Sequence, residues 1–194
     1  MPAAVQLAQA AYLAGGILCL ILVARSTLPA ALFWGVGAIL HTALAAVEFA
    51  DLLDLSAFVG LEGDLRYLAF TAGLLALAFG AVFSLVLPPG SKRITLLTGI
   101  ALALLIAAAA DRLPLGKLPL PLILLGILLV ATVVGLRHRP APARWLLVAT
   151  LLLALAELGR HGYLGFLPAA PGSIARICFG VALAACGMTA YRAR

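Results

Sequence analysis

Hydrophobic and polar positions divide the chain into seven apolar runs that are separated by short polar turns. The runs lie near residues 4–24, 30–53, 65–87, 94–110, 119–136, 145–163 and 173–190. Most are close to the roughly 20 residues that a helix needs to cross a bilayer. Clusters of Pro, Gly and charged residues mark the turns between them. The pattern therefore predicts an all-α polytopic membrane protein, built as one bundle of seven transmembrane helices.

Composition supports a membrane protein and argues against a nucleic-acid-binding one. Hydrophobic residues make up 65% of the chain and charged residues 10%, and the mean hydropathy is +1.20, far above the range of soluble domains. The net charge is +6, but the basic residues stand singly at the ends of apolar runs and form no basic stripe of the kind that binds phosphate backbones. The lipid bilayer is therefore the expected partner.

The distribution of Lys and Arg predicts the orientation of the bundle. One side, formed by the first, third and fifth turns and the C-terminus, holds eight of the 13 basic residues. These are Arg25, Lys92, Arg93, Arg137, Arg139, Arg144, Arg192 and Arg194. The other side mixes its basic residues with acidic ones. By the positive-inside rule the N-terminus lies outside and the C-terminus in the cytoplasm, most simply in a bacterial cytoplasmic (inner) membrane.

A faint internal repeat follows the same spacing in both halves of the chain. Each of the two tryptophans opens a span, a glutamate follows near the end of that span, and an arginine opens the next span 18 or 19 residues later. The two series are Trp34, Glu48, Arg66 and Trp145, Glu157, Arg176. They predict parallel three-helix repeats, 4–87 and 119–190, joined by span 94–110. This layout is similar to that of SWEET-type sugar carriers, which implies a carrier for small solutes.

The second span carries the chemistry that the rest of the chain lacks. Trp34, His41 and Glu48 follow one another at intervals of seven, with Asp51 one turn beyond, so they are expected to share one helix face. Ionisable groups at membrane depth usually face a bundle interior or a wet cavity. The face is therefore the candidate wall of a polar pocket that opens on the extracytoplasmic side and takes a small molecule or lipid.

Charged residues near the outer ends of neighbouring spans can complete this pocket. The pairs Glu48 with Arg66 and Glu157 with Arg176 are each placed to form an ion pair across a helical hairpin. Arg160 and His161 come one turn after Glu157 and extend its cluster toward the outer surface. If they form ion pairs, these residues stabilise the bundle. If they line the pocket, they bind the small molecule or lipid inside it.

His41 lies near the middle of its span and has three possible roles. It can ligate a metal or haem, relay protons, or donate a hydrogen bond to a carbonyl. His41, Asp51 and His161 are the candidate metal ligands, with a zinc ion as the first expectation and haem as the second. The chain has no H-E-x-x-H, G-x-S-x-G or nucleotide-binding signature.

The segment around His41 resembles a known family. Gly35-Val-Gly-Ala-Ile-Leu-His41-Thr-Ala-Leu44, followed by Asp51, resembles the Gly-x-Gly…His-x-Thr-Leu…Asp segment of alkaline ceramidases in the CREST superfamily of seven-span, metal-dependent hydrolases. The paired histidines of that family's last span have no counterpart in IARICFGVALAACG. The resemblance implies metal binding by His41 and Asp51 and a membrane-embedded hydrolase.

Three classes of function stay open at this point. The first is a small-molecule- or lipid-binding accessory subunit of a membrane complex, which short turns and few reactive groups favour. The second is the CREST-like metal-dependent hydrolase, and the third is a small-solute carrier. We take the accessory subunit as the leading interpretation, with other membrane subunits as its partners.

Overall fold

The computed structural model describes residues 3–53, 60–87, 93, 95, 97–101, 120–160 and 171–193. Within these residues every regular element is a helix. Five of the helices, over residues 3–24, 31–52, 62–86, 140–159 and 172–192, are long and apolar enough to cross a membrane. A shorter apolar helix covers Ile123–His138. The predicted all-α class is confirmed, and these helices indicate an integral membrane protein.

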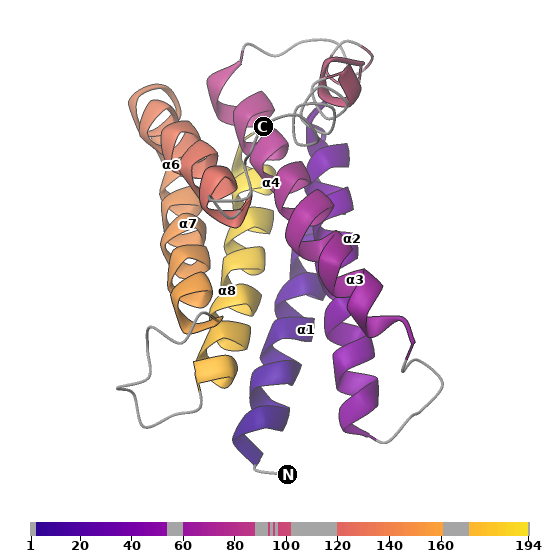
Figure 1. The fold of residues 1–194 in the computed structure, drawn as a ribbon. Coiled ribbons are helices and arrows are strands. Elements are labelled where there is room, and N and C mark those ends of the chain that lie inside the picture. Colours follow the sequence, from indigo (N-terminus) through magenta and orange to yellow (C-terminus); the bar gives the residue numbers. More distant parts are fainter. Residues whose placement is uncertain are drawn as a thin grey trace.

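Among the described helices, α1, α3, α4, α6 and α8 run in one direction along the bundle, and α2 and α7 run in the opposite direction (Figure 1). Their bounds are α1 Ala3–Ala24, α2 Ala31–Leu52, α3 Glu62–Leu68, α4 Leu74–Ala81, α6 Leu120–His138, α7 Pro140–Arg160 and α8 Pro171–Arg192. Two π-helical segments, η2 (Ala69–Gly73) and η3 (Val82–Val86), join α3 and α4 into one continuous span and end it. Most of the predicted span 94–110 lies outside the described residues.

Two helices begin earlier than the charge pattern predicts. Residues 137–144 were expected to form a turn, but α6 continues to His138 and α7 starts at Pro140, so that only Arg139 lies between them. Proline suits the first turn of a helix, where its missing N–H has no partner to lose. Similarly, α3 starts at Glu62 and carries Glu62 and Asp64 in its first turn, where acidic side chains favour the helix dipole.

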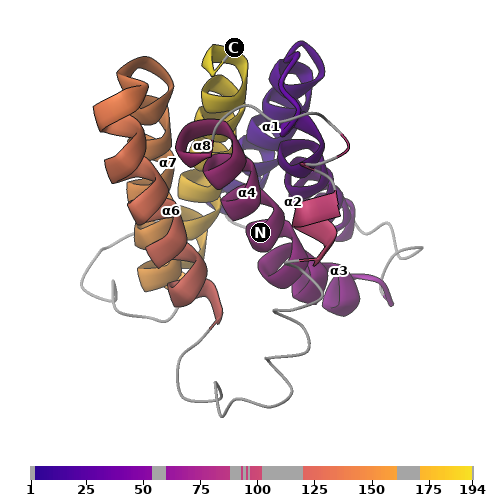
Figure 2. The same cartoon turned by 90° about the horizontal axis from the view of Figure 1, so that it is seen from above.

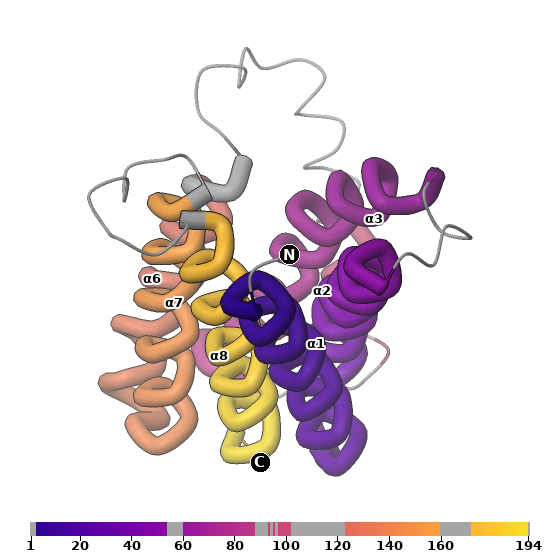
Figure 3. The backbone as a smooth tube through the Cα atoms, turned by 90° about the horizontal axis from the view of Figure 1, so that it is seen from below, coloured from indigo at the N-terminus to yellow at the C-terminus, as the bar shows by residue number. Residues whose placement is uncertain are grey.

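The helices close into a ring. Along it α1 packs on α2, α2 on η2 and α4, α4 and η3 on α6, α6 on α7, α7 on α8, and α8 back on α1. The views along the bundle show α6 and α7 on one side, α2 and α3 on the other, and α1 and α8 between them (Figures 2 and 3). The first and last helices of the chain therefore lie side by side.

Small residues allow α1 and α8 to come into backbone contact. A Cβ built on Gly15 would overlap the carbonyl of Gly180, one built on Gly180 would overlap the carbonyl of Ala11, and one on Gly187 would come within 2.8 Å of the Cys19 Cα atom. Close contact between small residues is a main source of packing energy for membrane helices, because the hydrophobic effect does not drive apolar side chains together within lipid.

The ring has two chemically different ends. At one end, here called the Glu48 end, α2 and α7 finish and α3 and α8 begin; at the other, the Arg139 end, α6 meets α7 and the chain terminates (Figure 1). All acidic residues of the described ranges belong to the Glu48 end: Glu48, Asp51, Glu62, Asp64 and Glu157.

Candidate functional site

Three side chains at seven-residue intervals form the buried face of α2, as predicted. Trp34 and His41 are fully buried and Glu48 is 8% exposed. At 1.5 Å of rise per residue they follow one another about 10.5 Å apart along the helix. Asp51 does not belong to this face, since it is exposed to the outside of the bundle. It lies in the last turn of α2, which ends at Leu52.

The Glu48 carboxylate holds three helices together. Its Oε1 accepts a hydrogen bond from Arg66 Nη2 at 2.8 Å, and its Oε2 accepts one from Arg176 Nε at 3.4 Å. The arginines come from α3 and α8, and their side chains are 49% and 33% exposed, against 9% for that of Glu48. Arg66 is shared with Glu62, four residues before it. A buried carboxylate thus faces two guanidinium groups that reach toward the outside.

The predicted pairing of these charges is confirmed in one hairpin and differs in the other. Glu48 and Arg66 form the expected ion pair. Arg176 was expected to pair with Glu157, whereas the structure places its Nε on Glu48, because α8 packs against α1 and α2 as well as α7. Glu157 is buried in α7 at 4% exposure. The Arg160 side chain and His161 lie outside the described residues.

Two polar residues of α1 face α2 between Glu48 and His41. The fully buried Gln9 donates from Nε2 to the Ala45 carbonyl at 2.9 Å. One turn later the Tyr12 hydroxyl lies 2.8 Å from His41 Nδ1. We did not predict either residue from the sequence, although two polar side chains three positions apart in an apolar helix are a usable signal. Together they extend the polar interior from the Glu48 end to mid-bundle.

His41 is enclosed by aromatic rings from three helices. Phe179 of α8 stacks on the imidazole with centroids 5.6 Å apart and planes at 28°, and Phe70 of η2 meets its edge at 5.7 Å and 88°. Tyr12 supplies the third ring, at 6.3 Å. The imidazole is fully buried, and within the described parts of the chain Nε2 has no hydrogen-bond partner.

The open nitrogen of His41 faces a glycine of the π-helical segment η2. A Cβ built on Gly73 would come within 3.3 Å of both Nε2 and Cδ2 of the imidazole. Gly73 therefore leaves space beside Nε2 that any other residue would reduce. π-Helical turns inside α-helices are frequent at functional sites, and buried polar atoms usually have partners. The combination makes His41 the chemically distinctive residue of the core.

The described residues do not assemble the predicted metal site. His41 and Asp51 belong to one continuous helix, where ten residues of rise separate them by about 15 Å, so one ion cannot bind both directly. Among described residues no three His, Cys, Asp or Glu side chains form a group that could hold a metal ion. A site that includes His161 stays a prediction.

Of the three residues on the buried face of α2, Trp34 lies nearest the Arg139 end. Its indole Nε1 donates to Ser84 Oγ in η3 at 3.0 Å, and the ring packs on Gly80, where a Cβ would lie 2.7 Å away. Both partners of this hydrogen bond are buried. Trp145, its counterpart in the predicted repeat, is instead 40% exposed, so the two tryptophans differ in environment.

Replacing Trp34 with phenylalanine is expected to lower the free energy of unfolding by about 1–2 kcal/mol, because a buried Ser84 hydroxyl loses its partner. Adding Ser84→Ala to this variant should cost less than Ser84→Ala alone does. Trp145→Phe is the matched control and should stay within about 0.5 kcal/mol of the parent. Thermal melting in detergent measures all four proteins; equal losses for the two tryptophans would contradict the assignment.

Arg139 is a further polar residue that the sequence did not identify as a site. It is the single non-helical residue between α6 and α7. Its Nη1 donates to the carbonyls of Ser84, at 3.1 Å, and Ala193, at 3.2 Å. The sequence signal was an arginine followed directly by the proline that begins a helix, which places a cation at a helix junction. The sequence pattern indicated only that this arginine lies on the more basic side of the bundle.

Comparison of the chain with models of known protein families, with curated proteins and with solved structures finds no match.

Proposed function

We propose that the chain is a membrane-embedded binding protein for a lipid or small amphiphile, and that it serves as an accessory subunit of a membrane complex. In this proposal a polar pocket opens at the Glu48 end, and His41 hydrogen-bonds the ligand inside the bundle. The seven-span topology, with the parallel repeat, is part of the proposal.

The charge difference between the two ends supports an orientation. The Arg139 end carries Arg25, Arg93, Arg137, Arg139, Arg144 and Arg192. All of the acidic residues in the described ranges belong to the other end, as noted above. Under the positive-inside rule the Arg139 end faces the cytoplasm and the Glu48 end the outside. A bacterial inner membrane fits this arrangement, and ligand would then enter from the extracytoplasmic leaflet.

The observation that carries the proposal is the open Nε2 of the buried His41. An imidazole at this depth is costly unless its polar atoms are used. Tyr12 uses Nδ1, which leaves Nε2 facing Gly73 for a hydroxyl or carbonyl of a ligand. Phe70 and Phe179, which line the same imidazole, would contact the apolar part of that ligand. Amphiphiles combine both kinds of group.

Two substitutions of His41 separate its ring nitrogens. The amide of glutamine reaches about as far as Nε2, whereas that of asparagine reaches only about as far as Nδ1. We expect mild detergent extracts of the parent to retain a stoichiometric amphiphile, detected by mass spectrometry. His41→Gln should keep most of it, and His41→Asn should lose at least about tenfold in occupancy, which corresponds to about 1.4 kcal/mol.

The control for this experiment is Asp51→Asn, an exposed change on the same helix that should leave occupancy unchanged. The proposal fails if folded parent protein carries no amphiphile, or if His41→Asn retains as much as the parent. Elemental analysis of the same sample tests the hydrolase alternative. Stoichiometric zinc that is lost in both His41 variants would replace the binding proposal with a metalloenzyme.

One observation favours the carrier as a second candidate. The Glu48 carboxylate links α2 and α3 of the first predicted repeat to α8 of the second, and ion pairs between repeats at one end of a bundle are suited to open and close a substrate path. If the chain is a carrier, Glu48→Gln should change substrate flux in liposomes. No flux by the parent over a broad panel of small solutes would contradict this candidate.

A further inference from the structure

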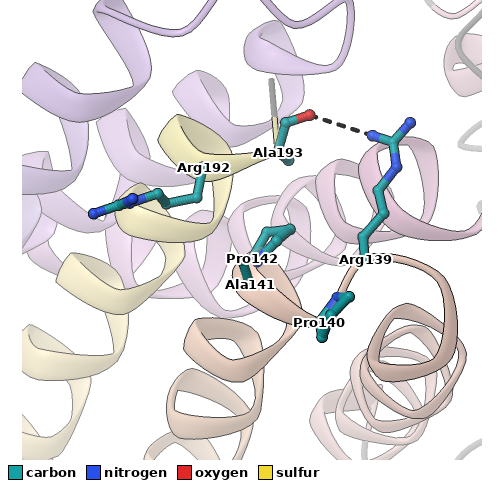
Figure 4. Close-up of a pocket in the computed structure, with 6 residues that line it drawn as sticks. All are labelled: Arg139, Pro140, Ala141, Pro142, Arg192 and Ala193. Carbon is teal, nitrogen blue, oxygen red and sulfur yellow. Dashed lines mark hydrogen bonds between the residues drawn. The ribbon is translucent and has the colours of Figure 1, made fainter.

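A pocket at the Arg139 end lies where the α6–α7 junction meets the end of α8. Arg139, Pro140, Ala141, Pro142, Arg192 and Ala193 line it, and its volume is about 350 Å³ (Figure 4). This volume falls within the roughly 300–1,000 Å³ that small-ligand pockets occupy. The pocket lies at the opposite end of the bundle from Glu48 and plays no part in the function proposed above.

Arg139 presents to this pocket a positive charge that no carboxylate of the described residues pairs with. Its two hydrogen bonds to the Ser84 and Ala193 carbonyls both come from Nη1, which leaves the donors on Nε and Nη2. A guanidinium held by neutral carbonyls keeps its full charge and offers the paired donors that phosphate oxygens accept.

The surroundings of the pocket add further positive charge. Pro140 begins α7 and Arg192 ends α8, so the positive end of one helix dipole and the negative end of another both lie at the pocket wall. Arg192 lines the pocket from α8, and Figure 4 shows its guanidinium extending away from Arg139. Because this side chain is exposed, it can turn toward a bound anion. Arg137 and Arg144, both exposed, increase the positive potential nearby.

Exposed apolar residues on the two helices that meet at the pocket indicate the source of the anion. Leu136, Trp145 and Val148, all within three turns of Arg139, are 36%, 40% and 42% exposed. A tryptophan at this depth is typical of the boundary between head groups and acyl chains. Basic pockets at the cytoplasmic ends of membrane helices bind anionic head groups. A lipid can therefore place its phosphate in the pocket while its chains cover these residues.

We infer that this pocket binds the phosphate of an anionic phospholipid in the leaflet at the Arg139 end, with Arg139 as the central ligand and Arg192 at its rim. Free phosphate shares the same chemistry, so the test includes both. Purified full-length protein in neutral detergent is melted with phosphatidylglycerol, with phosphatidylcholine or with inorganic phosphate. Phosphatidylglycerol is expected to raise the melting temperature in a saturable way, and the other two are not.

Charge-matched variants locate the effect. Arg139→Lys keeps the charge but loses the paired donors, so the apparent Kd for phosphatidylglycerol should rise about tenfold or more. Arg192→Gln should raise it about threefold, as expected for an exposed charge. Arg137→Gln removes a neighbouring exposed charge that does not line the pocket, and should change the Kd by less than about twofold.

Several outcomes would overturn the inference. Equal stabilisation by phosphatidylcholine would show that binding does not depend on the negative charge of the lipid. Equal stabilisation by inorganic phosphate alone would show that the pocket binds phosphate without needing a lipid. If Arg137→Gln weakens binding as much as Arg192→Gln does, the lipid responds to net charge and not to this pocket. Because Arg139→Lys also alters two backbone contacts, it could fail to fold; the comparison of Arg192→Gln with Arg137→Gln then decides.

Discussion

Replacing Gly180 with leucine is expected to cost more stability than any other single change considered for this protein. A Cβ at this position overlaps the carbonyl of Ala11, and its other near contacts are also backbone atoms of α1. A backbone cannot move aside by changing rotamer, so α1 and α8 must separate. Overpacking that no side chain can relieve exceeds the usual range of about 1–3 kcal/mol. We expect little folded protein after purification in detergent.

The matched control for this change is Gly126→Leu. Gly126 is an exposed residue of α6, and a Cβ built there meets no atom within 4 Å. The new leucine would face lipid. Replacing glycine with leucine also improves helix propensity, by up to about 1 kcal/mol. Yield and melting temperature should therefore match or exceed those of the parent. Similar melting temperatures for both variants would mean that the α1–α8 seam is looser than described.

Removing the Glu48 carboxylate is the second large change. Glu48→Ala leaves Arg66 and Arg176 facing each other without their shared partner. Breaking a fully buried pair costs about 3–5 kcal/mol. Because both arginines are partly exposed to solvent, we expect a smaller loss, of about 2–3 kcal/mol. Melting in detergent at constant lipid content measures this loss.

The double variant of Glu48 and Arg66 separates pairing from packing. Glu48→Ala combined with Arg66→Ala should destabilise less than the sum of the single changes, because one of the two stranded charges is gone. Arg176 still lacks its partner in this double variant, so only part of the lost stability is recovered. Adding Arg176→Ala should recover the rest of the loss that is due to unpaired charge. Glu62→Ala removes the exposed partner of the same Arg66 and should cost less than about 1 kcal/mol. If the losses of stability from the single changes simply add in the combined variants, Glu48, Arg66 and Arg176 do not act as one ion-pair cluster.

The sequence predicted most of the described helices but not their order in the ring. Apolar runs of membrane-spanning length predicted α1, α2, α6 and α8 to within a few residues, because lipid requires each span to satisfy its backbone internally. The start of α7 was missed because charges at Arg137, Arg139 and Arg144 were read as a loop. A helix tolerates such charges where its first turn reaches the membrane surface.

In the candidate site, too, contacts between residues close in the sequence were easier to predict than contacts between distant ones. The Glu48–Arg66 pair was predictable because it closes a hairpin only 18 residues long. The contact of Arg176 with Glu48 joins α8 to α2 across 128 residues, and no local spacing specifies it. The contact of Tyr12 with His41 joins the consecutive helices α1 and α2, and it was missed although it also lies within one hairpin. Asp51 failed because it lies in the last turn of α2, which ends at Leu52, and its side chain is exposed there.

The closure of the ring by α8 sets an order for biosynthesis. α2 ends at Leu52 and α8 starts only at Pro171, so at roughly 5–20 residues per second the ribosome needs about 6–24 s after the second helix is complete to reach the start of the last one. During this interval Gly15 has no glycine to pack on, His41 lacks the Phe179 ring, and Glu48 has only one of its arginines. A chain interrupted before α8 therefore leaves Glu48 and His41 without the contacts that the last helix supplies.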